Sequence, residues 1–162
     1  PVIIPDGGPQ MVRHVYAGEV ARFLSELLGR ENTFGEAYNV CQRETPSLFE
    51  LVGMMSQMLG SQSKLVPVET PDIVAAGFTP RTLSPLSSQW MSVLDPFKAE
   101  TELGFRHEPL WVYLGKIVAS LVAYARATPP EGYERRAEEI SFCEKWLKDR
   151  ESFRPPPTLR FT

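Results

Sequence analysis

Two histidines and two cysteines are the side chains of this sequence best suited to move protons or attack a substrate. Imidazole titrates near neutral pH, so His14 or His107 could each act as a general base. Neither stands in a motif with a nucleophile, and a solvated or packed histidine is the better interpretation of both. Cys41 and Cys143 have no adjacent base in the sequence and form no Cys-x-x-Cys pair. We therefore expect unreactive thiols and no catalytic residue. We also expect no metal site, because the two cysteines stand far apart outside any ligand motif and only two histidines could join them.

Composition indicates that these residues belong to a packed protein of one-domain length. The chain has 162 residues, of which 43% are hydrophobic and 23% charged. Its net charge of -3 gives no electrostatic reason to bind DNA or RNA. The most apolar stretch, residues 110–125, is interrupted by polar residues and glycine, and no signal-like segment opens the chain. We expect a cytoplasmic protein with neither a nucleic-acid partner nor a membrane partner.

Hydrophobic periodicity and turn residues predict alternating strands and helices, followed by helices alone. The predicted elements are a strand at 2–4, a tight turn at 5–9, an extended stretch at 11–16, a helix at 18–28, a strand at 35–40, a helix at 48–59, a strand at 64–68, a short helix from 95 or 96 to 103, and helices at 110–127 and 131–151.

Local motifs set some of these boundaries. Ser47 and Glu50 form a capping-box signature, which begins the helix that follows. Residues 71–94 contain Gly77, Pro80 and Pro85 and are predicted to form an irregular loop, a kind of segment that often carries binding residues. The body of the protein is assigned to residues 1–152, and residues 153–162 form a Pro-rich tail.

Five short blocks stand in the order and spacing of one family. The chain resembles the C-terminal half of an NAD-dependent epimerase/dehydratase of the extended short-chain dehydrogenase/reductase class. The resemblance implies a mixed, helix-rich α/β fold: the C-terminal part of a Rossmann-type protein without its N-terminal dinucleotide-binding half. The blocks are Val2 to Gly8, Arg13 to Ala21, Gly35 to Val40, Ser47 to Leu51, and Asp95 to Ala99 together with Leu103 to Phe105.

The resemblance implies two substrate-binding arginines. Arg13 matches the family arginine that reaches a phosphate of a nucleotide-sugar substrate, and a guanidinium suits that role because its planar donors can hold two phosphate oxygens. An arginine lying beside a strand or paired with a surface carboxylate is the alternative. Arg81 is the only arginine in the loop where the family places a second phosphate contact, although the usual Arg-Pro-Gly-Asp context is missing. Asn39, at the family's Tyr-Asn-Val strand end, is interpreted as a structural hydrogen-bonding residue.

The cofactor and catalytic motifs of the family are absent from these residues. No glycines form the Gly-rich turn that binds a dinucleotide pyrophosphate. No tyrosine has a lysine four positions later, the arrangement in which a cation favours the phenolate base. The full-length parent would use NAD or NADP, whereas this chain alone is predicted to bind no cofactor and to be noncatalytic.

Two functions follow from this comparison. The first is the substrate-binding portion of an NAD(P)-dependent nucleotide-sugar epimerase/dehydratase-like enzyme, whose ligand is a nucleotide-sugar-like small molecule. In the family, the segments resembling residues 20–28 and 37–40 pack on the dinucleotide-binding sheet. Without the first half they would expose an apolar face and an unpaired edge, so we expect a homo-oligomer, a rearrangement or association with the missing half. The alternative is a noncatalytic binding or regulatory module derived from the same fold.

Overall fold

The protein is described by a computed structural model that covers residues 1–83, 86, 94–124 and 133–151. Its elements in chain order are β1 (Val2–Pro5), α1 (Ala17–Leu27), the 3-10 turn η1 (Glu31–Thr33), α2 (Leu48–Met58), β2 (Leu65–Val68), α3 (Thr70–Ala75), α4 (Pro80–Leu83), α5 (Phe97–Leu103), α6 (Leu110–Ala123) and α7 (Arg136–Glu151).

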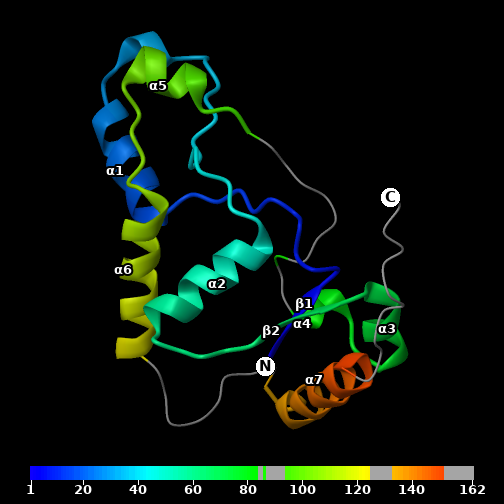
Figure 1. Cartoon of the computed structure of the whole chain (residues 1–162). Helices are drawn as coiled ribbons and strands as arrows, with labels where there is room; N and C mark the ends of the chain where they lie inside the picture. Colours follow the sequence, from blue (N-terminus) through cyan, green and yellow to red (C-terminus); the bar gives the residue numbers. More distant parts are fainter. Residues whose placement is uncertain (84–85, 87–93, 125–132, 152–162) are drawn as a thin grey trace, which may run out of the picture.

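The described elements form two lobes (Figure 1). The sheet lobe consists of β1, β2, α3, α4 and α7, and the helical lobe consists of α1, α2, α5 and α6. β1 and β2 pair in parallel, with Val2 opposite Leu65 and Pro5 opposite Val68. Parallel strands need a long crossover connection, and here that connection passes through α1 and α2 of the helical lobe. The mixed, helix-rich α/β class is therefore confirmed.

The core of the sheet lobe forms because β-branched residues of the two strands face apolar side chains of α3 and α7. Val66 and Ile73 are completely buried in this core, and Trp146 of α7 packs against it. The Trp146 indole Nε1 also donates to the Pro67 carbonyl at 3.2 Å. These contacts hold α7 against the sheet, although Arg136 comes 68 positions after the end of β2 (136 − 68).

The helical lobe has two neighbouring clusters of buried side chains. In one, Leu48 of α2 and Tyr113 of α6 pack together with Val12. In the other, Phe23 of α1 meets Phe105, with ring centroids 4.8 Å apart. Hydrophobic burial thus joins α1 to α5 and to Phe105 just after it, which are distant from α1 in sequence.

Most predicted boundaries are confirmed within one or two residues, because strong local signals set them. Ser47 accepts from the Glu50 N–H at 3.2 Å while the Glu50 carboxylate accepts from the Ser47 N–H at 2.8 Å, so the capping box is formed. Gly29 and Gly104 follow α1 and α5 with φ of 79° and 73°, a conformation that stops a helix at little cost for glycine. The last helix begins at Arg136 rather than at residue 131.

Two predictions are wrong. Residues 36–40 form no strand, because no other strand of the described chain lies beside them to complete a ladder. The predicted loop at 71–94 instead begins with the helices α3 and α4. The Asp6 carboxylate accepts from the Thr70 N–H at 2.7 Å, and Pro71 is compatible with the first turn, so tertiary contact starts α3 there. Residues 84–85 and 87–93 of that loop, and the Pro-rich tail, lie outside the described residues.

Apolar side chains remain exposed on α1 and after it. The predicted apolar stripe of this helix buries Phe23, whereas Leu24 and Leu28 are 58% and 83% exposed, and Phe34 is 73% exposed. The sequence predicts such an exposed apolar face for this helix when the first half of the family fold is missing. Association with that half or with a second copy of the chain stays a prediction.

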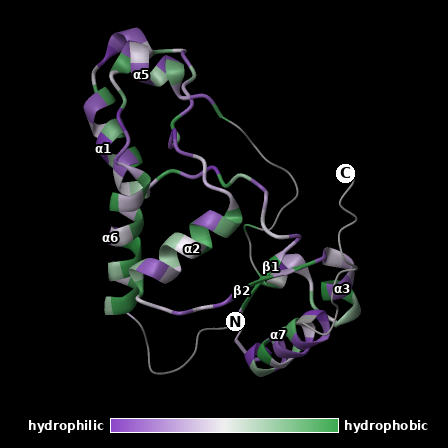
Figure 2. Ribbon diagram, viewed as in Figure 1, coloured by the Kyte–Doolittle hydropathy of each residue, from purple (hydrophilic) through white to green (hydrophobic). Residues whose placement is uncertain are grey.

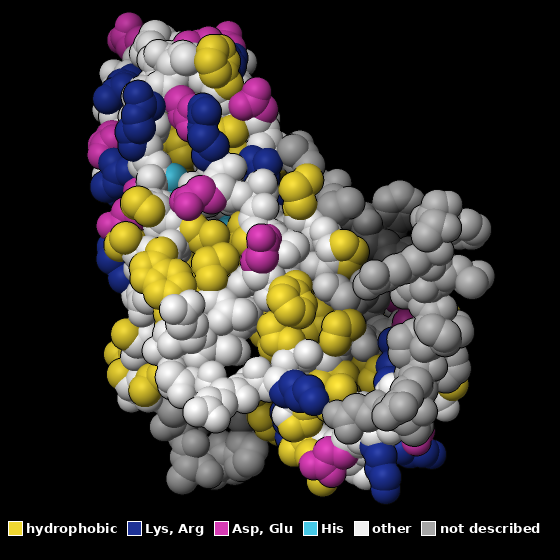
Figure 3. Space-filling model, in the orientation of Figure 1, with side chains coloured by type: hydrophobic (Ala, Val, Ile, Leu, Met, Phe, Trp, Pro, Cys, Tyr) yellow, Lys and Arg dark blue, Asp and Glu magenta, His cyan; other side chains and the backbone are white. Residues whose placement is uncertain are grey.

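α6 also carries hydrophobic residues along most of its length (Figure 2). Figure 3 shows hydrophobic side chains grouped over this helix, with charged side chains of both signs over the end that holds α1 and α5. Trp111 of this helix is 47% exposed. None of the helices among the described residues is long and apolar enough to cross a membrane.

Candidate functional site

Arg13 lies on a segment that is held beside residues 41–47. The Val12 N–H donates to the Pro46 carbonyl at 2.8 Å, and the Gln42 N–H donates to the His14 carbonyl at 3.1 Å. These backbone bonds on either side of Arg13 fix where its side chain starts. Met11 also forms an antiparallel bridge with Ser47. Because Ser47 caps α2, this bridge ties the segment that carries Arg13 to the start of that helix.

The Arg13 guanidinium contacts neutral acceptors. Its Nη1 donates to the Gln42 carbonyl at 3.3 Å and to the Leu94 carbonyl, and lies 3.5 Å from the Cys41 sulfur. Its Nε is buried without a hydrogen-bond partner, and no carboxylate of the described residues forms an ion pair with it. A charged guanidinium in this position keeps its positive charge uncompensated by the part of the protein that the structure describes.

A cavity of about 410 Å³ opens beside this guanidinium. Arg43 lines the cavity together with Arg13, so two guanidiniums border the same space. One carboxylate, that of Asp95, also lines it and accepts from the Phe97 N–H at 3.0 Å. The full lining consists of Arg13, Arg43, Leu94, Asp95, Pro96 and Phe97.

A second cavity of about 720 Å³ adjoins the first at Arg43 and Phe97, which line both. Arg43 is exposed and forms a two-pronged ion pair with Glu100, across this second cavity. Glu100 raises the pKa of Arg43, through hydrogen bonding and then charge. Because the Arg43 side chain is long and largely exposed, it can reach an anion in the first cavity by exchanging one carboxylate for another acceptor.

Buried Gln42 lines the second cavity, next to Arg43 in the chain. Its Nε2 donates to the Glu108 carbonyl at 2.8 Å and to the Glu44 carboxylate at 3.1 Å, and its Oε1 accepts from the Arg43 N–H at 2.7 Å. Glu44 in turn accepts from the Leu110 N–H at 2.7 Å, at the first residue of α6. The satisfied amide therefore positions the backbone from which Arg43 extends.

Arg81 does not share this site in the described structure. It is exposed on the single-turn helix α4 in the sheet lobe and lines neither cavity. Its predicted contact with a second phosphate stays a prediction. The sequence reasoning missed Arg43, which stands in no motif and is 30 residues from Arg13 (43 − 13), so only the folded chain brings the two together.

Other residues singled out in the sequence have structural contacts. The Asn39 side chain donates to the Asp95 carbonyl at 3.2 Å and so joins the 36–40 segment to the start of α5. This contact agrees with the structural interpretation of Asn39. Cys41 and Cys143 are free and buried, and burial raises the pKa of Cys143, which disfavours the reactive thiolate.

The two histidines, by contrast, meet at one tyrosine. The Tyr113 hydroxyl lies 2.9 Å from both ring nitrogens of His14, and the ring centroids of His107 and Tyr113 are 4.9 Å apart. Burial is the main cause that lowers the pKa of His14 and raises that of Tyr113. Packed histidines agree with the interpretation from sequence, but their convergence on Tyr113 across some 90 residues had no sequence signal.

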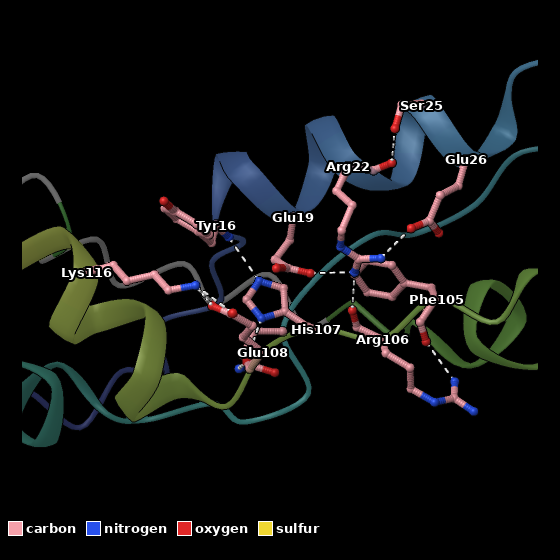
Figure 4. Close-up of polar contacts among 11 residues, drawn as sticks. Tyr16, Glu19, Arg22, Ser25, Glu26, Phe105, Arg106, His107, Glu108 and Lys116 are labelled. Carbon is pink, nitrogen blue, oxygen red and sulfur yellow. Dashed lines mark hydrogen bonds and ion pairs between the residues drawn. The ribbon is translucent and has the colours of Figure 1, made fainter.

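Around His107, polar contacts join α1 to the segment that leads into α6 (Figure 4). The His107 Nε2 accepts from the Tyr16 N–H at 3.0 Å, and its Nδ1 lies 2.7 Å from the Glu108 carbonyl. On the same side of α1, the carboxylate of buried Glu19 pairs with Arg22 at 2.6 Å. Arg22 also donates to the Arg106 carbonyl at 2.8 Å, so this network ties the two segments twice.

No protein-family model, curated protein or solved structure matches the chain. Within the described residues, no group of three or more His, Cys, Asp or Glu side chains is arranged to hold a metal ion. The arrangement that remains is an arginine-bordered cavity, which can bind an anion by charge and hydrogen bonding.

Proposed function

We propose that this chain is the substrate-binding portion of an NAD(P)-dependent nucleotide-sugar epimerase/dehydratase-like enzyme, and that the Arg13 cavity takes the diphosphate of the substrate. The observation that carries the proposal is the Arg13 guanidinium, which borders a cavity of about 410 Å³ and has no carboxylate partner among the described residues. The sequence blocks around Arg13 and Asp95 support the same assignment, because both blocks line this cavity.

Recognition in this proposal depends on charge and on geometry. Arg13 supplies a fixed guanidinium, held by the carbonyls of Gln42 and Leu94. Arg43 supplies a second one that can leave Glu100 when a more highly charged anion enters. The Asp95 carboxylate repels a bare anion, so it favours a ligand whose hydroxyl groups can donate to it, such as a sugar or ribose.

The residues present do not fit a nicotinamide cofactor. β1 is followed by Gly7 and Gly8, but the next helix begins only at Ala17. Gly8 serves packing instead: a Cβ added there would meet the Ile4 side chain at 2.7 Å and the Phe49 nitrogen at 2.9 Å. A turn occupied in this way leaves no cradle for a pyrophosphate. We therefore assign no chemical step to this chain, whose part in the reaction is to bind and orient the substrate.

Titration with nucleotide sugars tests the proposal. UDP-glucose, GDP-mannose and dTDP-glucose are titrated into the chain, with binding followed by calorimetry and by ligand-observed NMR. We expect Arg13→Lys to weaken binding by about tenfold or more, because lysine keeps the charge and loses the forked donors. Arg43→Ala should weaken it less, since Arg43 is exposed and shares its charge with Glu100.

Lys148→Ala is the matched control, because it removes an exposed positive charge from α7 in the other lobe and should leave binding unchanged. Arg81→Ala tests the second phosphate contact predicted from sequence. Circular dichroism of each variant separates lost binding from lost folding. Absence of binding to every nucleotide sugar by the folded chain, or binding that Arg13→Lys leaves unchanged, would overturn the proposal.

A further inference from the structure

The hydrogen bonds of His107 require a neutral ring. A backbone carbonyl only accepts, so the Nδ1 that lies 2.7 Å from the Glu108 oxygen carries the proton. The Nε2 must then be the acceptor for the Tyr16 N–H at 3.0 Å. A second proton on the ring would place an N–H against an N–H, and this contact would break.

The contact matters because Tyr16 is the N-cap residue, directly before α1. The first helical turn is closed by the Glu19 N–H donating to the Tyr16 carbonyl at 2.9 Å, and the Tyr16 side chain itself makes no capping hydrogen bond. His107 therefore satisfies one of the free N–H groups at the start of α1 from a segment about 90 residues away.

His14 adds a second titratable ring to the same place. It is half-buried against the Tyr113 hydroxyl, and the Tyr16 ring stacks on the Tyr113 ring with centroids 5.9 Å apart. Burial lowers the pKa of His14, partly opposed by a backbone hydrogen bond, and the charge of His107 lowers it further. Burial and the neighbouring His107 ring therefore both oppose protonation of His14.

The charged groups around the cluster already have partners. Lys116 of α6 lies 6.0 Å over the Tyr16 ring and pairs with Glu108 at 2.6 Å. Arg13 precedes His14 in the chain, and Arg106 precedes His107 and donates to the backbone carbonyls of Glu100 and Phe105. The carboxylates near the cluster are each bound by a donor: Glu19 by Arg22, Glu44 by the Leu110 N–H, and Glu108 by Lys116. An imidazolium formed here would have to compete for a carboxylate that is already in use.

We propose that His14, His107 and Tyr113 form a pH-sensitive latch, which holds the start of α1 against residues 105–108 at neutral pH and releases it on acidification. His107 also lines the cavity of about 720 Å³, so release changes a wall of that cavity. The latch does not depend on whether the Arg13 cavity binds a nucleotide sugar.

Site-specific amide hydrogen exchange tests this latch in the unmodified chain. Exchange of residues 16–20 and of α7 is measured at pH 7.5 and at pH 5.5, corrected for the intrinsic pH dependence of exchange. We expect protection at the start of α1 to fall relative to α7 by roughly fivefold or more, the change expected for the loss of one hydrogen bond. α7 is the internal control, because both histidines of the chain lie in the other lobe.

Two variants assign the effect to the histidines. In His107→Gln the side-chain carbonyl can still accept from the Tyr16 N–H but cannot titrate, so protection should persist at pH 5.5. His14→Gln should reduce the pH dependence less, because His14 does not bind the helix start directly. A parallel change in α1 and α7 with pH, or an unaltered pH dependence in His107→Gln, would overturn the latch.

Discussion

The core of the sheet lobe contains aliphatic and aromatic side chains with one buried thiol, whereas the core of the helical lobe brings imidazole and phenol groups into contact with the apolar residues. In the sheet lobe, Val66, Ile73 and Cys143 are completely buried. In the helical lobe, buried Tyr113 uses its hydroxyl for His14 and its ring for His107. Both cavities also lie in the helical lobe or beside it.

This difference indicates which lobe can change its packing when protons or anions bind. An apolar core gains its free energy from burial and is insensitive to pH between about 5 and 8. The helical lobe has imidazoles in its core, and the Arg13 guanidinium borders it without a carboxylate partner among the described residues. Protonation or anion binding can therefore change the packing of this lobe. The sheet lobe therefore provides a constant support, and the helical lobe carries the responsive groups.

The largest expected effect is on the helical lobe. Phe23→Ala removes an aromatic side chain that is 1% exposed and packs edge-on against Phe105, so we expect a loss of about 3–5 kcal/mol in the free energy of unfolding. Urea denaturation followed by hydrogen exchange measures the loss and locates it in α1 and α5. Leu24→Ala, at an exposed position of the same helix, should change stability little. Equal losses for the two variants would contradict the packing of α1 described here.

Ile73→Ala makes the corresponding change in the sheet lobe. The side chain is fully buried between α3 and the strands, and we expect a loss of about 2–5 kcal/mol, with the decreased protection in β1, β2 and α7. Val74→Ala is the matched control, because Val74 is 56% exposed on the same helix. If protection in α1 fell as much as in β2, the two lobes would unfold as one cooperative unit. The lobes would then differ in the composition of their cores but not in their stability.

A smaller effect is expected at the junction between the lobes. Ser47→Ala removes the side-chain cap of α2 and should cost about 1 kcal/mol, whereas Ser47→Asp keeps an acceptor and should retain most of the stability. Thermal and urea denaturation at neutral pH measure both variants. An alanine variant as stable as the aspartate variant would show that packing alone fixes the start of α2.

The pH dependence of global stability gives the smallest effect and sharpens the same contrast. Because burial lowers the pKa of His14 in the folded chain below about 6.5, the unfolded chain binds more protons when the pH falls. This contribution to stability is complete above about pH 6.5 and is lost as the pH falls through the lower pKa of the folded chain. Urea midpoints between pH 8 and pH 5 should therefore decrease in the unmodified chain and decrease less in His14→Gln. If the urea midpoint depended on pH equally in both proteins, His14 would not contribute to the pH dependence of stability.

Local signals in the sequence predicted much of the fold. The capping box at Ser47 and the glycine after α5 set helix boundaries by backbone chemistry, which acts between residues a few positions apart. The strand at Val2 was predicted from a β-branched run, and the strand at 64–68 from its apolar residues. Such features need little information from the rest of the chain, and they are the ones that the structure confirms.

Predictions failed where a distant segment decides the outcome. Residues 35–40 have the composition of a strand, but a strand needs a neighbour to accept its hydrogen bonds, and none is present among the described residues. Conversely, α3 begins where Asp6, 64 residues earlier, accepts from the Thr70 N–H. The secondary-structure propensity of a short stretch of residues shows neither a missing strand neighbour nor a distant hydrogen-bond acceptor.

The candidate site divides in the same way. The sequence by itself determined the start of α2, the ends of α1 and α5 and the lack of a cofactor motif in these residues, because those depend on residue type and short-range spacing. Arg13 was chosen from the resemblance to a family. Only the tertiary structure decided that Arg43 borders the Arg13 cavity and that His14 and His107 meet at Tyr113. Arg13 and Arg43 are 30 positions apart, and His14 and Tyr113 are 99 positions apart. Burial of the apolar faces of α2 and α6 brings such distant segments together.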